Sequence, residues 1–118
     1  GASAAVQWVL QKLNIQFQVI SRKGNANLTY DQLSASVIKS HTLIINTSPM
    51  GMFPNVNEAP PIAYDAISAK HHLYDLVYNP IETLFMKNGL AKGATVQNGL
   101  AMLHIQAEES WAIWNAKM

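Results

Sequence analysis

A helical period gives way to a strand period within the stretch Val6-Gln7-Trp8-Val9-Leu10-Gln11-Lys12-Leu13-Asn14-Ile15-Gln16-Phe17-Gln18-Val19-Ile20. Its first apolar residues recur at helical spacing, which predicts an amphipathic helix over roughly Ala2 to Leu13. From Ile15 to Ile20 apolar and polar residues alternate, which predicts a strand with one buried face. Alternation of helix and strand is typical of an α/β fold.

The rest of the chain continues this alternation. Thr29-Tyr30-Asp31-Gln32 matches a capping box and predicts a short helix, after which Thr42 to Ile45 predicts a brief strand. A loop from 46 to 61 carries four of the five prolines. The remaining expected elements are a strand over His72–Tyr78, a helix over Glu82–Asn88 closed by Gly89, a strand stub over Ala94–Val96 and a long helix over Gly99–Lys117. The order predicts one domain, residues 1–118, with a doubly wound parallel sheet and helices on both faces.

Composition excludes several classes of protein. The chain has 118 residues, 49% hydrophobic and 13% charged, so it is neither disordered nor coiled-coil in composition. A net charge of +1 argues against a nucleic-acid-coating protein. The absence of cysteine removes disulfides, thiolate metal sites and cysteine nucleophiles. No apolar run approaches the ~20 residues of a membrane span, and no basic signal region precedes Val6. We therefore expect a cytoplasmic protein that does not bind membranes or nucleic acid.

The first helix has no strand before it, although a doubly wound sheet begins with one. Gly1 is therefore interpreted as the end of a glycine-rich strand-to-helix turn, where a pyrophosphate can approach the backbone and the helix N-terminus. An ordinary turn is the alternative, because glycine is common in turns.

A basic pair follows the Ile15–Ile20 strand, where a dinucleotide fold places the adenosine ribose. An acidic residue there selects NAD, whereas a basic one accommodates the 2′-phosphate of NADP. The position is occupied by Ser21-Arg22-Lys23, and Arg22 is the only arginine. Arginine offers a planar charged fork for phosphate. The pattern favours NADP over NAD, with a solvated basic turn as the alternative.

No metal site is predicted. The rings of His71 and His72 alternate faces on a strand, so they cannot share one ion. His104 and Glu108 lie one helical turn apart, but metal sites require three or four ligands.

Three further stretches carry a resemblance to a known family. They are Asn46-Thr47-Ser48-Pro49-Met50-Gly51-Met52, Tyr74-Asp75-Leu76-Val77-Tyr78-Asn79-Pro80-Ile81-Glu82-Thr83 and Asn98-Gly99-Leu100-Ala101-Met102-Leu103-His104-Ile105-Gln106-Ala107. In this order and spacing the chain resembles the C-terminal, NADP-binding half of shikimate dehydrogenase. The resemblance implies a Rossmann-like sheet that lacks its first strand here, and reversible hydride transfer between NADPH and 3-dehydroshikimate, giving shikimate, in aromatic amino acid biosynthesis.

The resemblance also implies a role for each matching residue. For the cofactor these are Gly1 and Ala2 at the pyrophosphate, Ser21, Arg22 and Lys23 at the 2′-phosphate, Thr47 and Ser48 beside the central part, and Leu76 and Gly99 at the nicotinamide. For the substrate they are Tyr78 and Gln106. From the residues alone, the alternative for Gln106 is a solvent-exposed helix glutamine, and the alternative for Tyr78 is a half-buried strand tyrosine. Ala101 departs from the glycine that is usual in the family, and Lys23 from its common threonine.

The family's catalytic lysine and aspartate belong to an N-terminal substrate domain, so we expect no catalytic residue in this chain. In the strand order 3-2-1-4-5-6 the absent first strand is central. We expect its absence to separate the strands of Phe17 and Leu43 from those of Leu76 and Val96. The gap would be filled by an N-terminal fragment of the same enzyme or by a second chain. Two alternatives stay open, an NAD-dependent quinate/shikimate dehydrogenase and a non-catalytic nucleotide-binding regulatory module.

Overall fold

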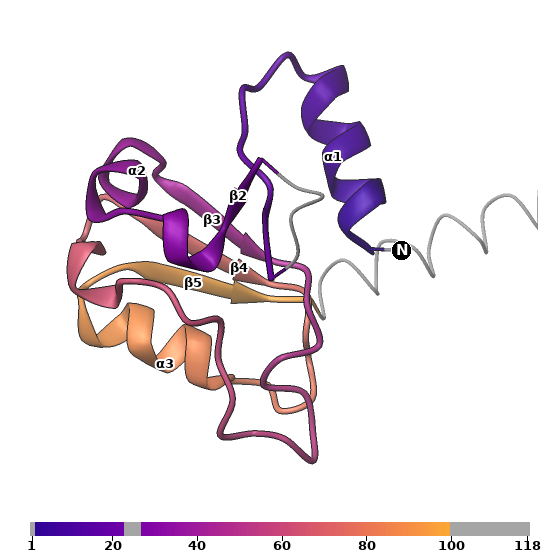
Figure 1. The fold of residues 1–118 in the computed structure, drawn as a ribbon. Coiled ribbons are helices and arrows are strands. Elements are labelled where there is room, and N and C mark those ends of the chain that lie inside the picture. Colours follow the sequence, from indigo (N-terminus) through magenta and orange to yellow (C-terminus); the bar gives the residue numbers. More distant parts are fainter. Residues whose placement is uncertain (1, 23–26, 100–118) are drawn as a thin grey trace, which may run out of the picture.

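A computed structural model of the chain describes residues 2–22 and 27–99, so the expected helix over Gly99–Lys117 lies outside the described part beyond its first residue. Helices and strands alternate (Figure 1). The helices are α1 (Ala2–Lys12), α2 (Ala35–Ser40) and α3 (Leu84–Ala91), with 3₁₀ turns η1 (Tyr30–Gln32) and η2 (Tyr64–Ala66). The strands are β1 (Ile20–Ser21), β2 (Leu28–Thr29), β3 (Leu43–Asn46), β4 (His72–Asp75) and β5 (Thr95–Asn98).

The described strands form two parallel groups. The larger is a three-stranded sheet in the order β3-β4-β5, and the smaller pairs β1 with β2. Each pairing is parallel, which confirms the predicted α/β class. In Figure 1, α3 lies on one side of the three-stranded sheet and α1 on the other.

The hydrophobic core lies between the three-stranded sheet, α2 and α3. Ile38 of α2, Leu73 of β4 and Phe85 of α3 belong to one buried cluster, with Leu73 completely inaccessible to solvent. Ile44 and Val96, the neighbours of Leu73 on β3 and β5, pack against it. This core fixes the strands whose carboxyl ends form the site described below.

The helix at the N-terminus is confirmed, whereas the strand predicted after it is mostly wrong. α1 ends at Lys12, one residue before the predicted end. Residues 15–19 carry no strand, and only Ile20 and Ser21 pair, with Leu28 and Thr29. Alternation provides the faces of a strand, but a strand also needs a hydrogen-bonded neighbour, and the segment 15–19 does not pair with β3.

The position of the expected gap is also corrected. β3 pairs directly with β4 along four residues, from Leu43↔His72 to Asn46↔Asp75, so Leu43 remains with the strands of β4 and β5. The separation lies instead between the segment 15–21 and β3. The sequence pattern did not reveal the short strand β2. Because β2 precedes β3, the strand of Leu43 is one place later in the chain order of strands than the sequence pattern predicted.

Three other boundaries differ from the prediction. Gln32 does close a capping box, because its Oε1 accepts from the Thr29 N–H at 3.0 Å, but the box opens the 3₁₀ turn η1. The following helix α2 is separately capped by Ser34. β4 ends at Asp75 rather than Tyr78, because the Asp75 carboxylate takes the Val77 N–H at 3.0 Å. β5 extends beyond its expected stub to Asn98, paired with β4 throughout.

Gly89 does not close the helix α3 but lies inside it. The helix ends at Ala91, and Gly93 follows with a φ of 87°, where the Gly93 N–H donates to Leu90 O (3.0 Å) and the Ala94 N–H to Gly89 O (3.1 Å). This pattern is a Schellman motif with glycine at its left-handed position. Gly89 instead permits the close approach of α3 to β4, because a Cβ there would lie 2.5 Å from Leu73 Cδ2.

Replacement of Gly89 by alanine tests whether glycine is needed for the close packing of α3 against β4. Helix propensity alone would raise the free energy of unfolding by about 1 kcal/mol. Overpacking against the buried Leu73 costs about 1–3 kcal/mol, so we expect a net loss of about 1 kcal/mol in urea-induced unfolding. Lys87→Ala, at an exposed position of the same helix, is the control and should cause no loss. A Gly89→Ala chain more stable than the wild type would contradict the close-packing role.

A candidate cofactor site at the carboxyl edge of the sheet

The predicted site residues follow strands that end at one edge of the sheet. The register Asn46↔Asp75↔Asn98 places the last residues of β3, β4 and β5 side by side. Thr47, Leu76 and Gly99 therefore begin adjacent segments. This is the edge at which open α/β sheets bind their ligands.

The loop after β3 is shaped by Ser48 and Asn46. The Ser48 hydroxyl and its backbone N–H both donate to Asn46 Oδ1, at 2.6 and 3.1 Å, and Ser48 Oγ accepts from the Met50 N–H at 3.3 Å. Asn46 and Met50 are buried, whereas Thr47 and Ser48 are partly exposed. The loop thus presents the two predicted cofactor residues on a fixed support.

The segments after β4 and β5 are in direct contact. The Leu76 N–H donates to Asn46 O at 3.1 Å, and the Gly99 N–H donates to Val77 O at 3.4 Å. A side chain at Gly99 would collide with the Leu76 carbonyl oxygen, so glycine is required here. Tyr78 follows Leu76 by two residues, and 47% of its surface is exposed.

Arg22 brings the end of β1 to the same edge. Its Nη2 lies 3.5 Å from Met50 Sδ. Within residues 2–22 and 27–99, this is the one hydrogen bond that the Arg22 side chain makes. Thioether sulfur is a weak acceptor, so most of the five guanidinium donors stay available to an anion. Burial raises the pKa of Tyr30, and the nearby Arg22 charge partly lowers it again. The structure therefore brings Arg22, next to Ser21, to the loop of Thr47 and Ser48.

The carboxyl edge contains polar residues to which the sequence interpretation gave no role. Asp75 is completely buried, and its carboxylate accepts from Asn46 Nδ2 (3.1 Å), Val77 N (3.0 Å) and Thr83 Oγ1 (2.7 Å). Burial raises the pKa of Asp75, while these hydrogen bonds act in the opposite direction. A carboxylate between Tyr74 and Leu76, within an expected strand, was the signal that could have identified it.

Some predictions lie outside the described residues. They concern Gly1, Lys23 and Gln106, and the pair His104 and Glu108. Ala2, predicted at the pyrophosphate, begins α1. His71 and His72 have different partners: His71 is buried between Ser68 and Ile38, whereas His72 Nδ1 lies 2.7 Å from Thr95 Oγ1. Over the described ranges no group of three or more metal-ligating side chains gathers, and no helix there could cross a bilayer.

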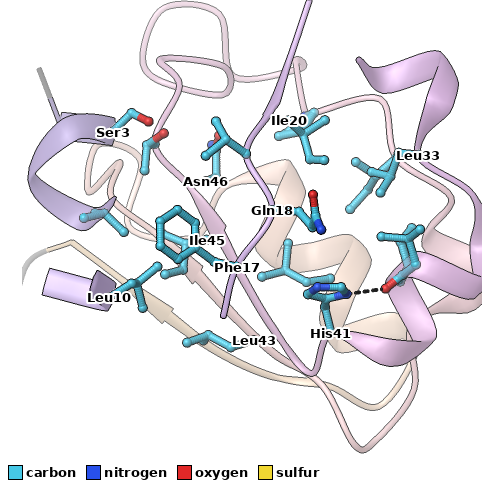
Figure 2. Close-up of a pocket in the computed structure, with 18 of the residues that line it drawn as sticks. Ser3, Leu10, Phe17, Gln18, Ile20, Leu33, His41, Leu43, Ile45 and Asn46 are labelled. Atoms are coloured by element: carbon cyan, nitrogen blue, oxygen red, sulfur yellow. Dashed lines mark hydrogen bonds between the residues drawn. The ribbon is translucent and has the colours of Figure 1, made fainter. Parts of the chain in front are cut away.

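A groove of about 400 Å³ separates α1 and the segment 15–20 from β3. Among the residues that line it, labelled in Figure 2, are Phe17 and Ile20 of the segment 15–20, Leu43, Ile45 and Asn46 of β3, and Ser3 of α1. The lining is mostly apolar. Its end at Ser3 and Asn46 coincides with the carboxyl edge of the sheet.

Unpaired strand edges border the groove. Thr42 O and Asn46 O accept from His72 and Leu76, at 2.7 and 3.1 Å, so the even-numbered residues of this strand direct their backbone groups toward β4. The N–H and C=O groups of Leu43 and Ile45 consequently point into the groove. Within the described residues, no strand pairs with this edge. The groove therefore has the form of a slot for an additional parallel strand.

The comparisons with known proteins find shikimate dehydrogenases among the relatives of this chain. The shikimate dehydrogenase (NADP(+)) of Methanococcus aeolicus is 39% identical over 106 residues, which covers 89% of this chain and 38% of that protein. A chorismate mutase/shikimate 5-dehydrogenase fusion protein from Clostridium acetobutylicum matches in structure with a TM-score of 0.83 and 37% identity, over 98% of this chain and 43% of that one. A shikimate dehydrogenase in complex with NADP⁺ matches with a TM-score of 0.68 and 28% identity, over 96% and 37%.

These matches confirm the resemblance to shikimate dehydrogenase and the Rossmann-type fold. The chain spans less than half the length of these three proteins. No protein-family model matches the chain.

Proposed function

We propose that this chain is the NADP-binding part of a shikimate dehydrogenase and takes part in the reversible reduction of 3-dehydroshikimate to shikimate. The observation that carries the proposal is the position of Arg22 beside the loop of Thr47 and Ser48, at the carboxyl edge of a parallel sheet. The names of the relatives, NADP-dependent shikimate dehydrogenases, support the same reaction.

The residues at this edge fit NADP. Arg22 has guanidinium donors available for the 2′-phosphate, and Ser21 precedes it. The loop of Thr47 and Ser48 would lie beside the central part of the cofactor. Gly99 allows close backbone approach next to Leu76, as expected for the nicotinamide end. When bound, the nicotinamide supplies the hydride acceptor or donor.

The chain's own contribution is to bind and orient. Tyr78 is half-exposed, three residues beyond the end of β4, and its hydroxyl would hydrogen-bond a hydroxylated substrate there. Gln106 would supply a second hydrogen bond. The proton transfer that accompanies hydride transfer requires a general acid, which we assign to the rest of the longer polypeptide. A location in the cytoplasm agrees with a biosynthetic role.

The groove supports a further part of the proposal. We propose that a strand from the rest of the polypeptide, the part that precedes α1 in the relatives, fills the slot between Ile20 and Ile45. Such a strand would run parallel to β3 and end near Ser3 and Asn46, where α1 begins (Figure 2). A glycine-rich turn would then join it to the helix. A second copy of this chain is the competing occupant.

Shikimate-dependent reduction of NADP⁺ tests the proposed function. The 118-residue chain alone should show no rate above background, because it lacks the general acid. A fusion that places the part of the Methanococcus aeolicus relative preceding its matched region ahead of Gly1 should reduce NADP⁺ when shikimate is added. A folded fusion that does not oxidise shikimate would contradict the proposed reaction, and activity of the chain alone would contradict the division of roles.

A further inference from the structure

A fully buried carboxylate at the end of β4 is hydrogen-bonded to the residue that supports the candidate cofactor loop. Asp75 has no exposed surface, and its three hydrogen-bond partners are the side chains of Asn46 and Thr83 and the Val77 N–H. All three donate, as an ionised carboxylate requires. Among the described residues, the ion pair present joins Lys92 to Asp65. No basic side chain of this part of the chain therefore neutralises Asp75. Its burial needs a reason other than ion pairing.

Asp75 fixes the orientation of Asn46. Because the carboxylate only accepts, the Asn46 amide must direct Nδ2 toward Asp75, at 3.1 Å. The amide oxygen then faces the loop, where it accepts from the Ser48 N–H and hydroxyl. A flipped amide would place its oxygen against the carboxylate and its NH₂ against the Ser48 donors. The direction of the hydrogen bond between Asn46 and Asp75 thus determines the direction of the hydrogen bonds between Asn46 and Ser48.

The network continues through the loop to Arg22. Ser48 Oγ accepts from the Met50 N–H at 3.3 Å, and Asn46 Nδ2 also lies 3.4 Å from Met50 O. Met50 Sδ in turn contacts Arg22 Nη2 at 3.5 Å. A continuous chain of contacts therefore runs from the end of β4 to the arginine at the end of β1.

We infer that Asp75 is a positioning residue, which orients Asn46 and thereby holds the loop of Thr47 to Met50 in the shape that receives NADP. The inference rests on the proposed function for its cofactor, but the effect on the loop can be measured without any cofactor. Thr83, which donates to Asp75 Oδ2 and accepts from the Met86 N–H, secures the carboxylate from the helix α3.

An exchange of the two side chains tests this role. Asp75→Asn removes the charge that fixes Asn46, and we expect NADP⁺ to bind about 3- to 10-fold more weakly. Asn46→Asp places a second carboxylate against that of Asp75 and should weaken NADP⁺ binding by about 30-fold or more. In the double variant Asn46→Asp/Asp75→Asn, an amide again donates to a carboxylate that accepts from Ser48. We expect it to recover at least about 10-fold of the Asn46→Asp loss.

Hydrogen exchange gives a readout that needs no cofactor. The amides of Ser48 and Met50 should exchange faster in each single variant and regain protection in the double variant. Ile67→Val, in the buried core away from the edge, is the stability control and should leave NADP⁺ affinity within about 2-fold. If Asp75→Asn does not fold, the comparison of Asn46→Asp with the double variant decides whether Asp75 positions the loop.

The outcomes separate this inference from the proposed function. Single variants that lose stability but keep NADP⁺ affinity and the protection of Ser48 and Met50 would reduce Asp75 to a structural residue and overturn the inference. A folded fusion with the Methanococcus aeolicus segment that does not bind NADP⁺ would overturn the proposed function. The exchange of Ser48 and Met50 would then still decide whether Asp75 positions the loop.

Discussion

Replacement of Arg22 by alanine is expected to weaken NADP⁺ binding by about 10- to 100-fold, which corresponds to the loss of charge-assisted hydrogen bonds worth about 1.5–3 kcal/mol. NAD⁺ binding should change by less than about 3-fold, because the 2′-phosphate is the group that distinguishes the two cofactors. Titration of the chain with each dinucleotide, followed by calorimetry, measures both affinities. The selectivity between them is the decisive quantity.

Two variants control this experiment. Lys39→Ala removes one positive charge from the exposed surface of α2 and should leave both affinities unchanged. Arg22→Lys keeps the charge but loses the planar fork, so we expect an intermediate affinity for NADP⁺. Equal weakening of NADP⁺ and NAD⁺ by Arg22→Ala would show that Arg22 does not bind the 2′-phosphate.

The fold class and the sheet edge shared by the candidate site residues could be predicted because both depend on local patterns. The spacing of Val6, Val9 and Leu10 specifies α1 without reference to the rest of the chain. The ends of the strands place Thr47, Leu76 and Gly99 at one edge as soon as the strands are parallel. The position of Arg22 beside that edge follows from the same topology.

The boundaries that could not be predicted depend on contacts between distant residues. The polar pair Gln97 and Asn98 extends β5 because both residues align with Tyr74 and Asp75 of β4. Gly89 resembles a helix stop in sequence, but the approach of Leu73 explains it. A pattern of residue types along the chain contains neither the register of a strand nor the surroundings of a glycine.

The buried network was missed for a related reason. Asn46, Asp75 and Thr83 lie within the motifs that carry the resemblance, but polar residues in loops and at strand ends are usually exposed. Only the structure shows Asp75 and Thr83 fully buried and joined by a hydrogen bond of 2.7 Å. The sequence therefore indicated the residues that would touch the cofactor more readily than those that support them.

Addition of the preceding strand is expected to produce the largest change in stability. The N–H and C=O groups of Leu43 and Ile45 provide four hydrogen bonds toward such a strand, at about 0.5–1.5 kcal/mol each. The strand would also cover Leu43, which is 46% exposed, and the half-buried Phe17. A gain of at least about 3 kcal/mol follows, equivalent to an increase of about 10–20 °C in Tm for a domain of this size.

The fusion with the Methanococcus aeolicus segment allows this gain to be measured at individual residues. In the chain alone, the amides of Leu43 and Ile45 face the groove and should exchange rapidly. In the fusion they should exchange at least 10-fold more slowly, since a parallel strand would pair with them. The amide of Ile44, whose neighbour on β4 is Leu73, is the internal control and should be protected in both proteins.

Ile45→Lys provides the matched control variant. Ile45 lines the groove and is only half-buried in the chain alone (Figure 2), so a lysine there can reach water. In the filled groove the same ammonium would be buried against an apolar strand, and an edge charge of this kind opposes strand addition. We therefore expect Ile45→Lys to leave the chain alone nearly unchanged and to abolish most of the gain in the fusion.

Native mass spectrometry of the chain alone distinguishes the two occupants of the groove. A monomer whose Leu43 and Ile45 amides exchange rapidly, and become protected in the fusion, supports a strand from the longer polypeptide. A dimer of two 118-residue chains in which these amides are already protected would show that a second copy completes the sheet. Rapid exchange of both amides in a folded, active fusion would contradict strand addition, because the cofactor site would then be formed without it.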